Sequence, residues 1–216
     1  MPLILPGNVA SATAGGFEVA NSCRFNDGDS AYMHKTPGGD GSSTVFTFSC
    51  WVKRGQLGTL QTFFSAGTAN KGQLVFDAED QLKILDDGAV IAETSRVFRD
   101  TSAWYHIVLA YNTGESGTDK VKIYVNGVQE TAFATDGRDG AGSLNYVNST
   151  EQQNYFADTS NFFDGYVAEV VMIDGSQLAA TSFGEFDEDS PTIWKPIDVS
   201  GLTFGTNGFY LDFEAS

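Results

Sequence analysis

The stretch of sequence that decides the fold is residues 104–129, WYHIVLAYNTGESGTDKVKIYVNGVQ. Along its first run the side chains alternate between two largely apolar sets, so this strand should be central, with both of its sides covered. The two sets are Trp104, His106, Val108 and Ala110, and Tyr105, Ile107, Leu109 and Tyr111. In the second run, residues 120–126, the apolar residues all fall on one face and the polar ones on the wetter opposite face. Asn126-Gly127 then supplies the positive φ angles of a type I′ turn into a third strand. The stretch therefore predicts an antiparallel β architecture.

The rest of the chain continues this pattern of short strands separated by turn residues. Further strands are expected at 22–25 with 30–34 as its partner, and at 46–53, 63–66, 74–76, 81–85, 89–94, 166–173 and 208–213. Residues 135–158 are interpreted as a long loop, and residues 178–183 as a short helical turn. Roughly a dozen strands with turn signals every 8–12 residues indicate a two-sheet sandwich of jelly-roll type.

Three segments in order resemble the laminin-G-like branch of the concanavalin A-like lectin/glucanase fold. They are FTFSCWVK at 46–53, the strand and hairpin at 104–127, and FFDGYVAEVVMIDGSQL at 162–178. The resemblance implies one all-β domain, a concanavalin A-like jelly-roll sandwich of two antiparallel sheets, over residues 22–216. It follows an extended N-terminal arm over residues 1–21. Trp51 and His106 match core positions of the family, so we expect them to be structural.

The two ends of the chain carry a narrower resemblance, to laminin-G-like virion proteins of tailed and especially marine phages. The matching segments are the opening 3–32 and IWKPIDVSGLTFGTNGFYLDF at 193–213. This resemblance implies a non-enzymatic, multicopy virion structural protein, either a capsid decoration or part of a fibre or tail appendage. It would assemble in the host cytoplasm, dock on other virion proteins and be exposed on the particle, with adhesion to host-surface glycans as a further role. The expected docking residues are Leu3, Ile4 and Leu5 in the arm, and Phe209 and Tyr210 near the C-terminus.

Composition excludes several classes of partner. The formal net charge is −16, from 28 acidic and 12 basic residues. Phosphates of DNA or RNA, and an anionic membrane surface, would be repelled by this charge. No run approaches the ~18 apolar residues of a membrane span, and the N-terminus lacks the basic region of a signal peptide. We therefore expect neither nucleic acid nor a membrane as a partner.

The two cysteines, Cys23 and Cys50, fall within expected strands among apolar neighbours. Buried free thiols are the first interpretation, since such cysteines behave as small hydrophobic residues. A disulfide is the alternative, and it would require the two strands to be adjacent, with Cα atoms within ~7 Å.

Catalytic motifs are not found in the sequence. Glycosidases on this fold place carboxylates along one strand in an E-x-D-x-x-E run, whereas residues 185–189, EFDED, lack the final glutamate and are interpreted as a solvated turn. The two histidines, His34 and His106, have no nucleophile motif beside them. A glycoside hydrolase is thus the third hypothesis, and we expect no enzyme activity.

The second hypothesis is a calcium-assisted carbohydrate-binding module. Calcium is the possible cofactor, although ordinary turn chemistry is the favoured explanation of each group of candidate ligands. Those ligands are Asn26, Asp27, Asp29, Asp158 and Asp164. A glycan would be held by aromatic rings and amide side chains of the long polar loop. The residues proposed for it are Tyr146, Gln152, Asn154, Tyr155, Phe156, Asn161 and Phe162.

Overall fold

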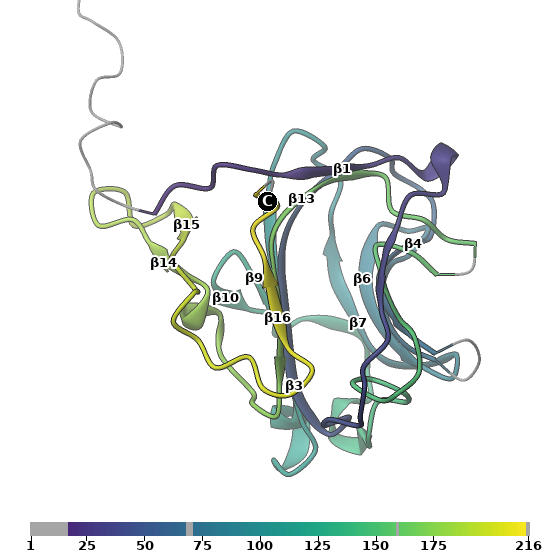
Figure 1. Ribbon diagram of the computed structural model, residues 1–216. Helices are drawn as coiled ribbons and strands as arrows, with labels where there is room; N and C mark the ends of the chain where they lie inside the picture. The colour runs from purple at the N-terminus through teal and green to yellow at the C-terminus, as the bar shows by residue number, and fades with distance from the viewer. Residues whose placement is uncertain (1–16, 68–70, 159, 215–216) are drawn as a thin grey trace, which may run out of the picture.

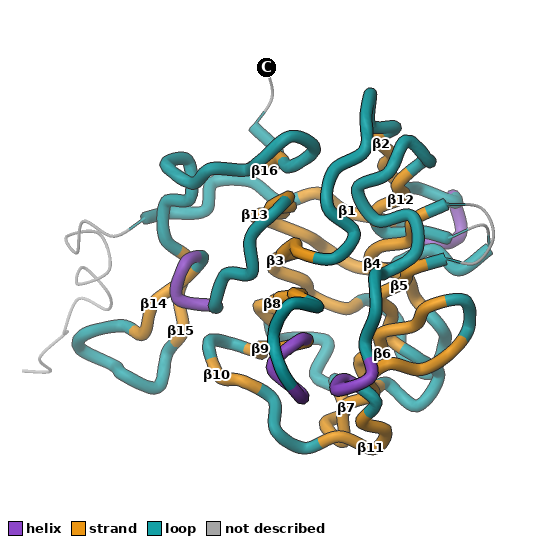
Figure 2. The backbone as a smooth tube through the Cα atoms, turned by 90° about the horizontal axis from the view of Figure 1, so that it is seen from below, coloured by secondary structure: helices purple, strands orange, loops and turns teal. Residues whose placement is uncertain are grey.

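The computed structural model describes residues 17–67, 71–158 and 160–214, which form a sandwich of two seven-stranded antiparallel sheets (Figures 1 and 2). The first sheet has the order β1-β13-β3-β8-β9-β10, and β16 also pairs with β13. Its strands are β1 (Cys23–Phe25), β3 (Val45–Arg54), β8 (Tyr105–Asn112), β9 (Val121–Val125), β10 (Val128–Gln129), β13 (Gly165–Asp174) and β16 (Phe209–Leu211). The predicted fold class, an all-β concanavalin A-like sandwich, is confirmed.

The second sheet has the order β11-β7-β6-β5-β4-β12-β2. Its strands are β2 (Met33–Lys35), β4 (Gln61–Ala66), β5 (Gly72–Phe76), β6 (Gln81–Asp86), β7 (Ala89–Val97), β11 (Phe133–Asp136) and β12 (Gln153–Tyr155). A separate hairpin joins β14 (Gly184–Phe186) to β15 (Trp194–Pro196) and lies beside the first sheet (Figures 1 and 2).

Helical structure in the described residues is limited to 3₁₀ turns. They are η2 (Asp27–Asp29), η3 (Gly117–Lys120), η4 (Arg138–Gly140) and η5 (Ala180–Ser182). The last lies where a helical turn is predicted. Within the described ranges, a helix with the length and apolar character needed to cross a membrane is not found.

Strand β8 has the central position that its sequence predicts, between β3 and β9. One set of its side chains, including Ile107 and Leu109, enters the main core between the two sheets. The other set includes Val108, which enters a second core on the outer face of the first sheet. Both sides are therefore covered, as the two apolar sets of the strand require.

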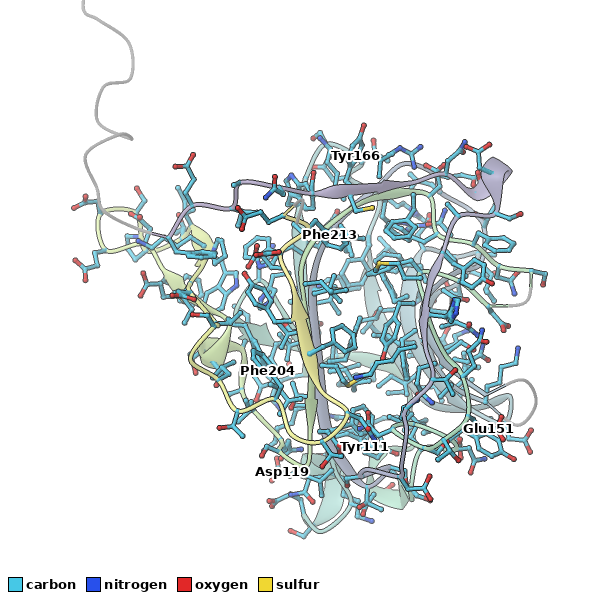
Figure 3. The ribbon with its side chains drawn as sticks, in the orientation of Figure 1. Tyr111, Asp119, Glu151, Tyr166, Phe204 and Phe213 are labelled. Atoms are coloured by element: carbon cyan, nitrogen blue, oxygen red, sulfur yellow. The ribbon has the colours of Figure 1, made fainter. Side chains whose placement is uncertain are left out.

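The cover of this outer face comes from the C-terminal part of the chain. After β13 the chain crosses back over the sheet, and Phe183, Trp194 and Val199 become buried against it. Figure 3 labels Phe204 and Phe213, which flank β16 on this returning segment. Burial of this second apolar surface holds the C-terminal segment on the domain.

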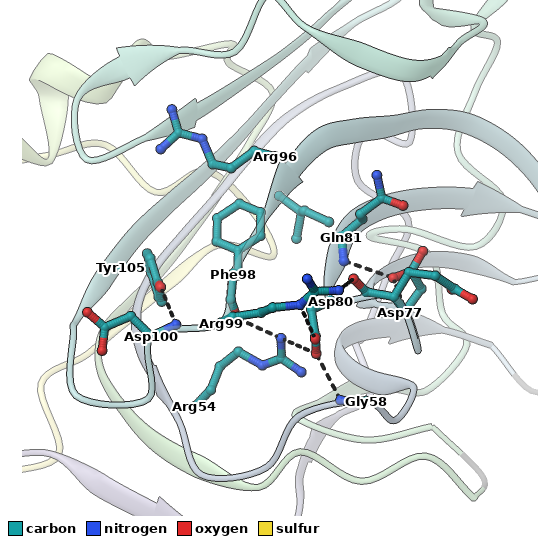
Figure 4. Close-up of polar contacts among 12 residues, drawn as sticks. Arg54, Gly58, Asp77, Asp80, Gln81, Arg96, Phe98, Arg99, Asp100 and Tyr105 are labelled. Atoms are coloured by element: carbon teal, nitrogen blue, oxygen red, sulfur yellow. Dashed lines mark hydrogen bonds and ion pairs between the residues drawn. The ribbon is translucent and has the colours of Figure 1, made fainter.

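A buried ion network links the end of β3 in the first sheet to the turn before β6 in the second sheet (Figure 4). Arg54 is fully buried, with its guanidinium 3.0 Å from Asp80 and 4.3 Å from the centre of the Phe76 ring. Asp80 also accepts hydrogen bonds from Gly58 N at 2.9 Å and Arg99 Nε at 3.0 Å. Although burial raises it, the pKa of Asp80 is lowered overall by these donors and by Arg54. Asp80 is therefore a fixed anion that ties the loop at residue 58 to the sandwich.

One prediction about strand pairing is wrong, and one predicted loop contains a strand. The strand at 30–34 was expected to pair with the one at 22–25, but β1 pairs with β13 and β2 pairs with β12. The intervening turn η2 carries the chain from one sheet to the other. The predicted loop 135–158 also contains β12, which inserts between β2 and β4 and extends the second sheet.

The two cysteines are free thiols. Cys50 lies in the main core, as predicted, whereas Cys23 is half-buried at its edge. Strand β13 lies between their strands in the first sheet, which separates the two thiols.

Candidate functional site

The candidate site lies at an edge of the second sheet, where β2 is the outermost strand and β12 is its neighbour. The register places Asn154 opposite His34 on β2 and opposite Ser65 on β4. The next residue, Tyr155, enters the main core. Because successive side chains of a strand point to opposite faces, Asn154 belongs to the outer face.

One exposed and one half-buried aromatic ring lie beside Asn154, whose side chain is on the outer face but is only 9% exposed. Tyr32 is 47% exposed, and its ring centre is 6.3 Å from that of Phe162 and 5.8 Å from that of His34. Gln152 Nε2 donates to Asn154 Oδ1 at 2.6 Å. We call these five residues the β2–β12 surface. Ring faces with side-chain amides next to them can pack on a sugar ring and hydrogen-bond its hydroxyl groups.

The sequence hypothesis identified part of this surface. Gln152, Asn154 and Phe162 lie on it, and Asn161 precedes Phe162 in the loop that folds back against β4. The backbone carbonyl of Asn161 accepts a hydrogen bond from Thr62 N at 3.4 Å. The hypothesis missed Tyr32 and His34, although their spacing of two places them on one face of an extended segment.

Three other predicted glycan-binding residues lie elsewhere. Tyr155 is 3% exposed and Phe156 is fully buried, so neither can offer a ring face to a sugar, and the hypothesis is wrong for both. The φ angle of Phe156 is +62°, which helps to turn its ring into the core, 4.9 Å from the Phe25 ring. Tyr146 is 40% exposed and packs over Gly67, whose amide donates to the Gln152 carbonyl at 2.9 Å. Tyr146 thus flanks the β2–β12 surface at the Gln152 end.

The predicted calcium ligands occupy three separate places. Asn26 donates to Asp29 at 2.7 Å in the turn that also contains Asp27. Asp164 pairs with Arg24 at 3.1 Å. Asp158 pairs with Lys71 and also accepts from Gln73. In the described ranges these carboxylates form no group of three or more potential ligands. Calcium binding stays a prediction.

The predicted docking residues are likewise divided. Leu3, Ile4 and Leu5 lie outside the described residues. Phe209 and Tyr210 belong to β16 and are half-buried against their own domain, so the segment does not project as a free docking element. The Tyr210 hydroxyl donates to Glu169 at 2.5 Å.

Glu169 is an acidic residue in an unusual position. It lies in a bulge of β13 with φ at +49°, and it is 5% exposed. Burial raises the pKa of its carboxyl, and the hydrogen bond from Tyr210 opposes that rise. The bulge therefore directs an acidic side chain under β16, where it anchors the strand.

His106 is a buried structural residue, as its sequence position implies. Trp194 Nε1 can only donate, so at 2.9 Å it fixes His106 Nδ1 as the acceptor. The proton then resides on Nε2, which donates to the Ser49 hydroxyl at 2.9 Å. Burial lowers the pKa of His106 to about 3, which keeps the ring neutral. The Trp51 ring stacks on it, with ring centres 4.9 Å apart.

The acidic run at 185–189 has the turn geometry that was expected over most of its length. Asp187 accepts backbone hydrogen bonds from Asp189 at 3.1 Å and Ser190 at 2.9 Å. Glu185 belongs instead to β14, and both it and Asp187 lie 3.3 Å from Lys195. These two carboxylates share one lysine at the surface.

An apolar groove, which the sequence did not reveal, opens on the outer face of the first sheet. It has a volume of about 460 Å³ and is lined by residues 17–22, Trp51, Trp104, Ala168 and Pro196. Pro196, at the end of β15, is the residue of the C-terminal cover that borders the groove. Sequence reasoning placed Trp51 in the core because nothing local indicates where the cover of the outer face stops.

Comparison with known proteins agrees with this fold. The family model described as Concanavalin A-like lectin/glucanases superfamily matches residues 26–180. No curated protein matches the sequence.

Solved structures show similar sandwiches at low identity. A candidate carbohydrate-binding protein from Bacteroides ovatus aligns with a TM-score of 0.52 and 19% identity, over 69% of this chain and 42% of that one. A pentraxin from Limulus polyphemus aligns at 0.46 and 10%, over 68% and 71%. A sialidase from Trypanosoma rangeli aligns at 0.46 and 16%, over 64% and 22%. At these identities the first likeness shows the fold alone, and this chain spans less than half of that protein.

Proposed function

The chain belongs to the concanavalin A-like lectin/glucanase superfamily, and from this premise we propose that it is a non-enzymatic binding domain that holds a glycan on its β2–β12 surface. The observation that carries the proposal is the exposed ring of Tyr32 with the half-buried ring of Phe162, beside the amide of Gln152, which is hydrogen-bonded to the 9% exposed Asn154. Aromatic faces supply apolar contact, and amides supply both donors and acceptors for hydroxyl groups.

The chemistry of this surface favours a neutral sugar. Its side chains are aromatic or amide groups together with one histidine, and the whole chain carries a net charge of −16. The nearby Lys35 ammonium already donates to the Asn207 carbonyl at 2.7 Å. An anionic sugar would gain no free lysine or arginine on this surface and would meet the repulsion of the whole domain.

The absence of catalysis is part of the proposal. His106 is buried and neutral, which removes it from any contact with substrate. Glu185 and Asp187 share Lys195 at the surface instead of facing each other across a sugar site. These placements support a binding role over hydrolysis.

The test is a glycan array followed by calorimetry on the glycans that bind. Tyr32→Ala and Phe162→Ala should each weaken binding about tenfold, because each removes one aromatic contact. Tyr166→Ala is the matched control, since Tyr166 is 43% exposed but lies on β13 of the first sheet. An array without binding, or equal affinities for all three variants and the parent, would refute the proposal.

The same array run with calcium and with a chelator separates the calcium-assisted alternative. Binding that disappears on chelation and returns with calcium would support a bound ion. Binding that is the same in both conditions would leave the aromatic and amide groups as the complete site.

We further propose a virion as the setting, as a structural protein docked on capsid or tail proteins. The support is the resemblance of residues 3–32 and 193–213 to segments of phage virion proteins. Display in many copies would convert weak single-site glycan affinity into strong attachment. Mass spectrometry of purified particles tests this setting, and a chain absent from the particles would exclude it.

A further inference from the structure

The apolar groove lies on the outer face of the first sheet, beside the part that the C-terminal segment covers. It is lined by Trp51 on β3 and Ala168 on β13, and by Pro196 from the C-terminal cover. Phe17 is 37% exposed and Trp104 is 36% exposed at its walls. A volume of about 460 Å³ is within the range of about 300–1,000 Å³ that binding pockets usually have.

The lining restricts what can bind. Glu18 is the one charged residue among the residues that line the groove, and the lining also includes three aromatic side chains, Phe17, Trp51 and Trp104. Aromatic-lined grooves of this kind suit extended, proline-containing peptide segments, whose conformation is largely set before binding.

We propose that the groove binds residues 2–6 of the same chain, PLILP, which we call the proline-flanked segment. This segment holds the one run of three large apolar residues within positions 1–16, and those sixteen positions carry no charged side chain. Pro2 and Pro6 fix their own φ angles and favour extended conformations in the residues before them. The segment therefore has the apolar, proline-containing sequence that such a groove suits.

The chain is long enough to make this contact within one molecule. Leu5 precedes Phe17 by 12 residues, and a chain of that length can span about 40 Å. Phe17 is itself a wall of the groove. Gly15 and Gly16 stand immediately before it, and glycine tolerates the backbone angles needed to reverse the chain. Attachment to the groove wall gives the segment a high effective concentration there.

The experiment compares two full-length triple variants of equal charge. Leu3→Asp/Ile4→Asp/Leu5→Asp disrupts the segment, and Asn8→Asp/Val9→Asp/Ala10→Asp is the matched control within the same arm. Tryptophan emission and acrylamide quenching report on the groove, because two of the three tryptophans line it and Trp194 is buried. The first variant should show red-shifted emission and a higher quenching constant, and the control should match the parent. When both triple variants are made in a Trp104→Phe background, the difference between their emission and quenching should become smaller.

Size-exclusion chromatography with light scattering identifies the source of the segment. An unchanged mass in both variants, together with the fluorescence change in the first alone, supports binding within one chain. Identical fluorescence in the parent and both variants would overturn the proposal. A parent dimer that becomes a monomer only in the first variant would also overturn it, because the occupant would then be the segment of a second copy.

Discussion

Acidification should destabilise this protein through His106. The ring nitrogen Nδ1 accepts the hydrogen bond of Trp194 and therefore cannot take up a proton without breaking that bond. Burial lowers the pKa of His106 from 6.5 to about 3. For a base with a lowered pKa in the folded state, the stabilising contribution is present above the unfolded pKa and is lost as the pH falls below it.

The magnitude follows from the two pKa values. Below pH 6.5 the unfolded chain binds a proton at His106 that the folded protein does not bind, and each pH unit lowers the free energy of unfolding by about 1.4 kcal/mol. At about pH 5 the loss is therefore about 2 kcal/mol relative to about pH 7.5. For a chain of this size that loss corresponds to a drop of roughly 4–8 °C in the melting temperature.

The assay is urea denaturation at both pH values for the parent and for His106→Gln. Glutamine keeps one donor and one acceptor but does not titrate, so this variant should lose less stability than the parent by about 2 kcal/mol between about pH 7.5 and pH 5. All other titrating groups are common to both proteins and cancel in the comparison. His34→Gln, at an exposed position, is the control and should behave like the parent.

Equal pH dependence in the parent and in His106→Gln would refute the reasoning. It would mean that the protonated ring is accommodated in the fold, and that the hydrogen bond with Trp194 does not hold His106 neutral.

Three further perturbations test other parts of the structure. Arg54→Met should lower the free energy of unfolding by about 3–5 kcal/mol, because Asp80 loses a buried cation. Adding Asp80→Asn should recover part of the lost stability, and denaturation curves that show no recovery would contradict this coupling. Gly127→Ala should cost more than about 2 kcal/mol, because its φ is +79° and the new Cβ would lie 2.2 Å from a facing indole ring. Gly88→Ala, at a φ of +78° with open space around it, measures the cost of the backbone strain alone. Equal melting temperatures for the Gly127→Ala and Gly88→Ala variants would argue against the clash. Burial raises the pKa of Glu169 above 4.5, so the stability that its neutral carboxyl contributes is present below that pH and is lost as the pH rises. Glu169→Gln should reduce the loss of stability as the pH rises above 4.5, and an unchanged slope would contradict a raised pKa for Glu169.

Local features were predictable because their causes lie within a few residues. The two apolar sets of β8 and the Asn126-Gly127 turn both occur in the structure, where these two residues have φ angles of +48° and +79°. Alternation and turn chemistry depend only on neighbouring residues, so they could be interpreted without knowing the partner strands. The two amide residues of the candidate surface, Gln152 and Asn154, were found for the same reason, as members of one Asn- and Gln-rich segment.

The sequence by itself therefore determined the fold class, the central strands and part of the candidate surface. The tertiary structure alone decided which strands meet, because pairing across distant segments carries no local signal. It placed three-residue β12 between β2 and β4, buried Tyr155 and Phe156, and brought Trp194 to His106 across 88 residues of sequence. It also decided where the C-terminal cover ends, and hence where the groove opens, since that depends on how one segment packs on a remote sheet.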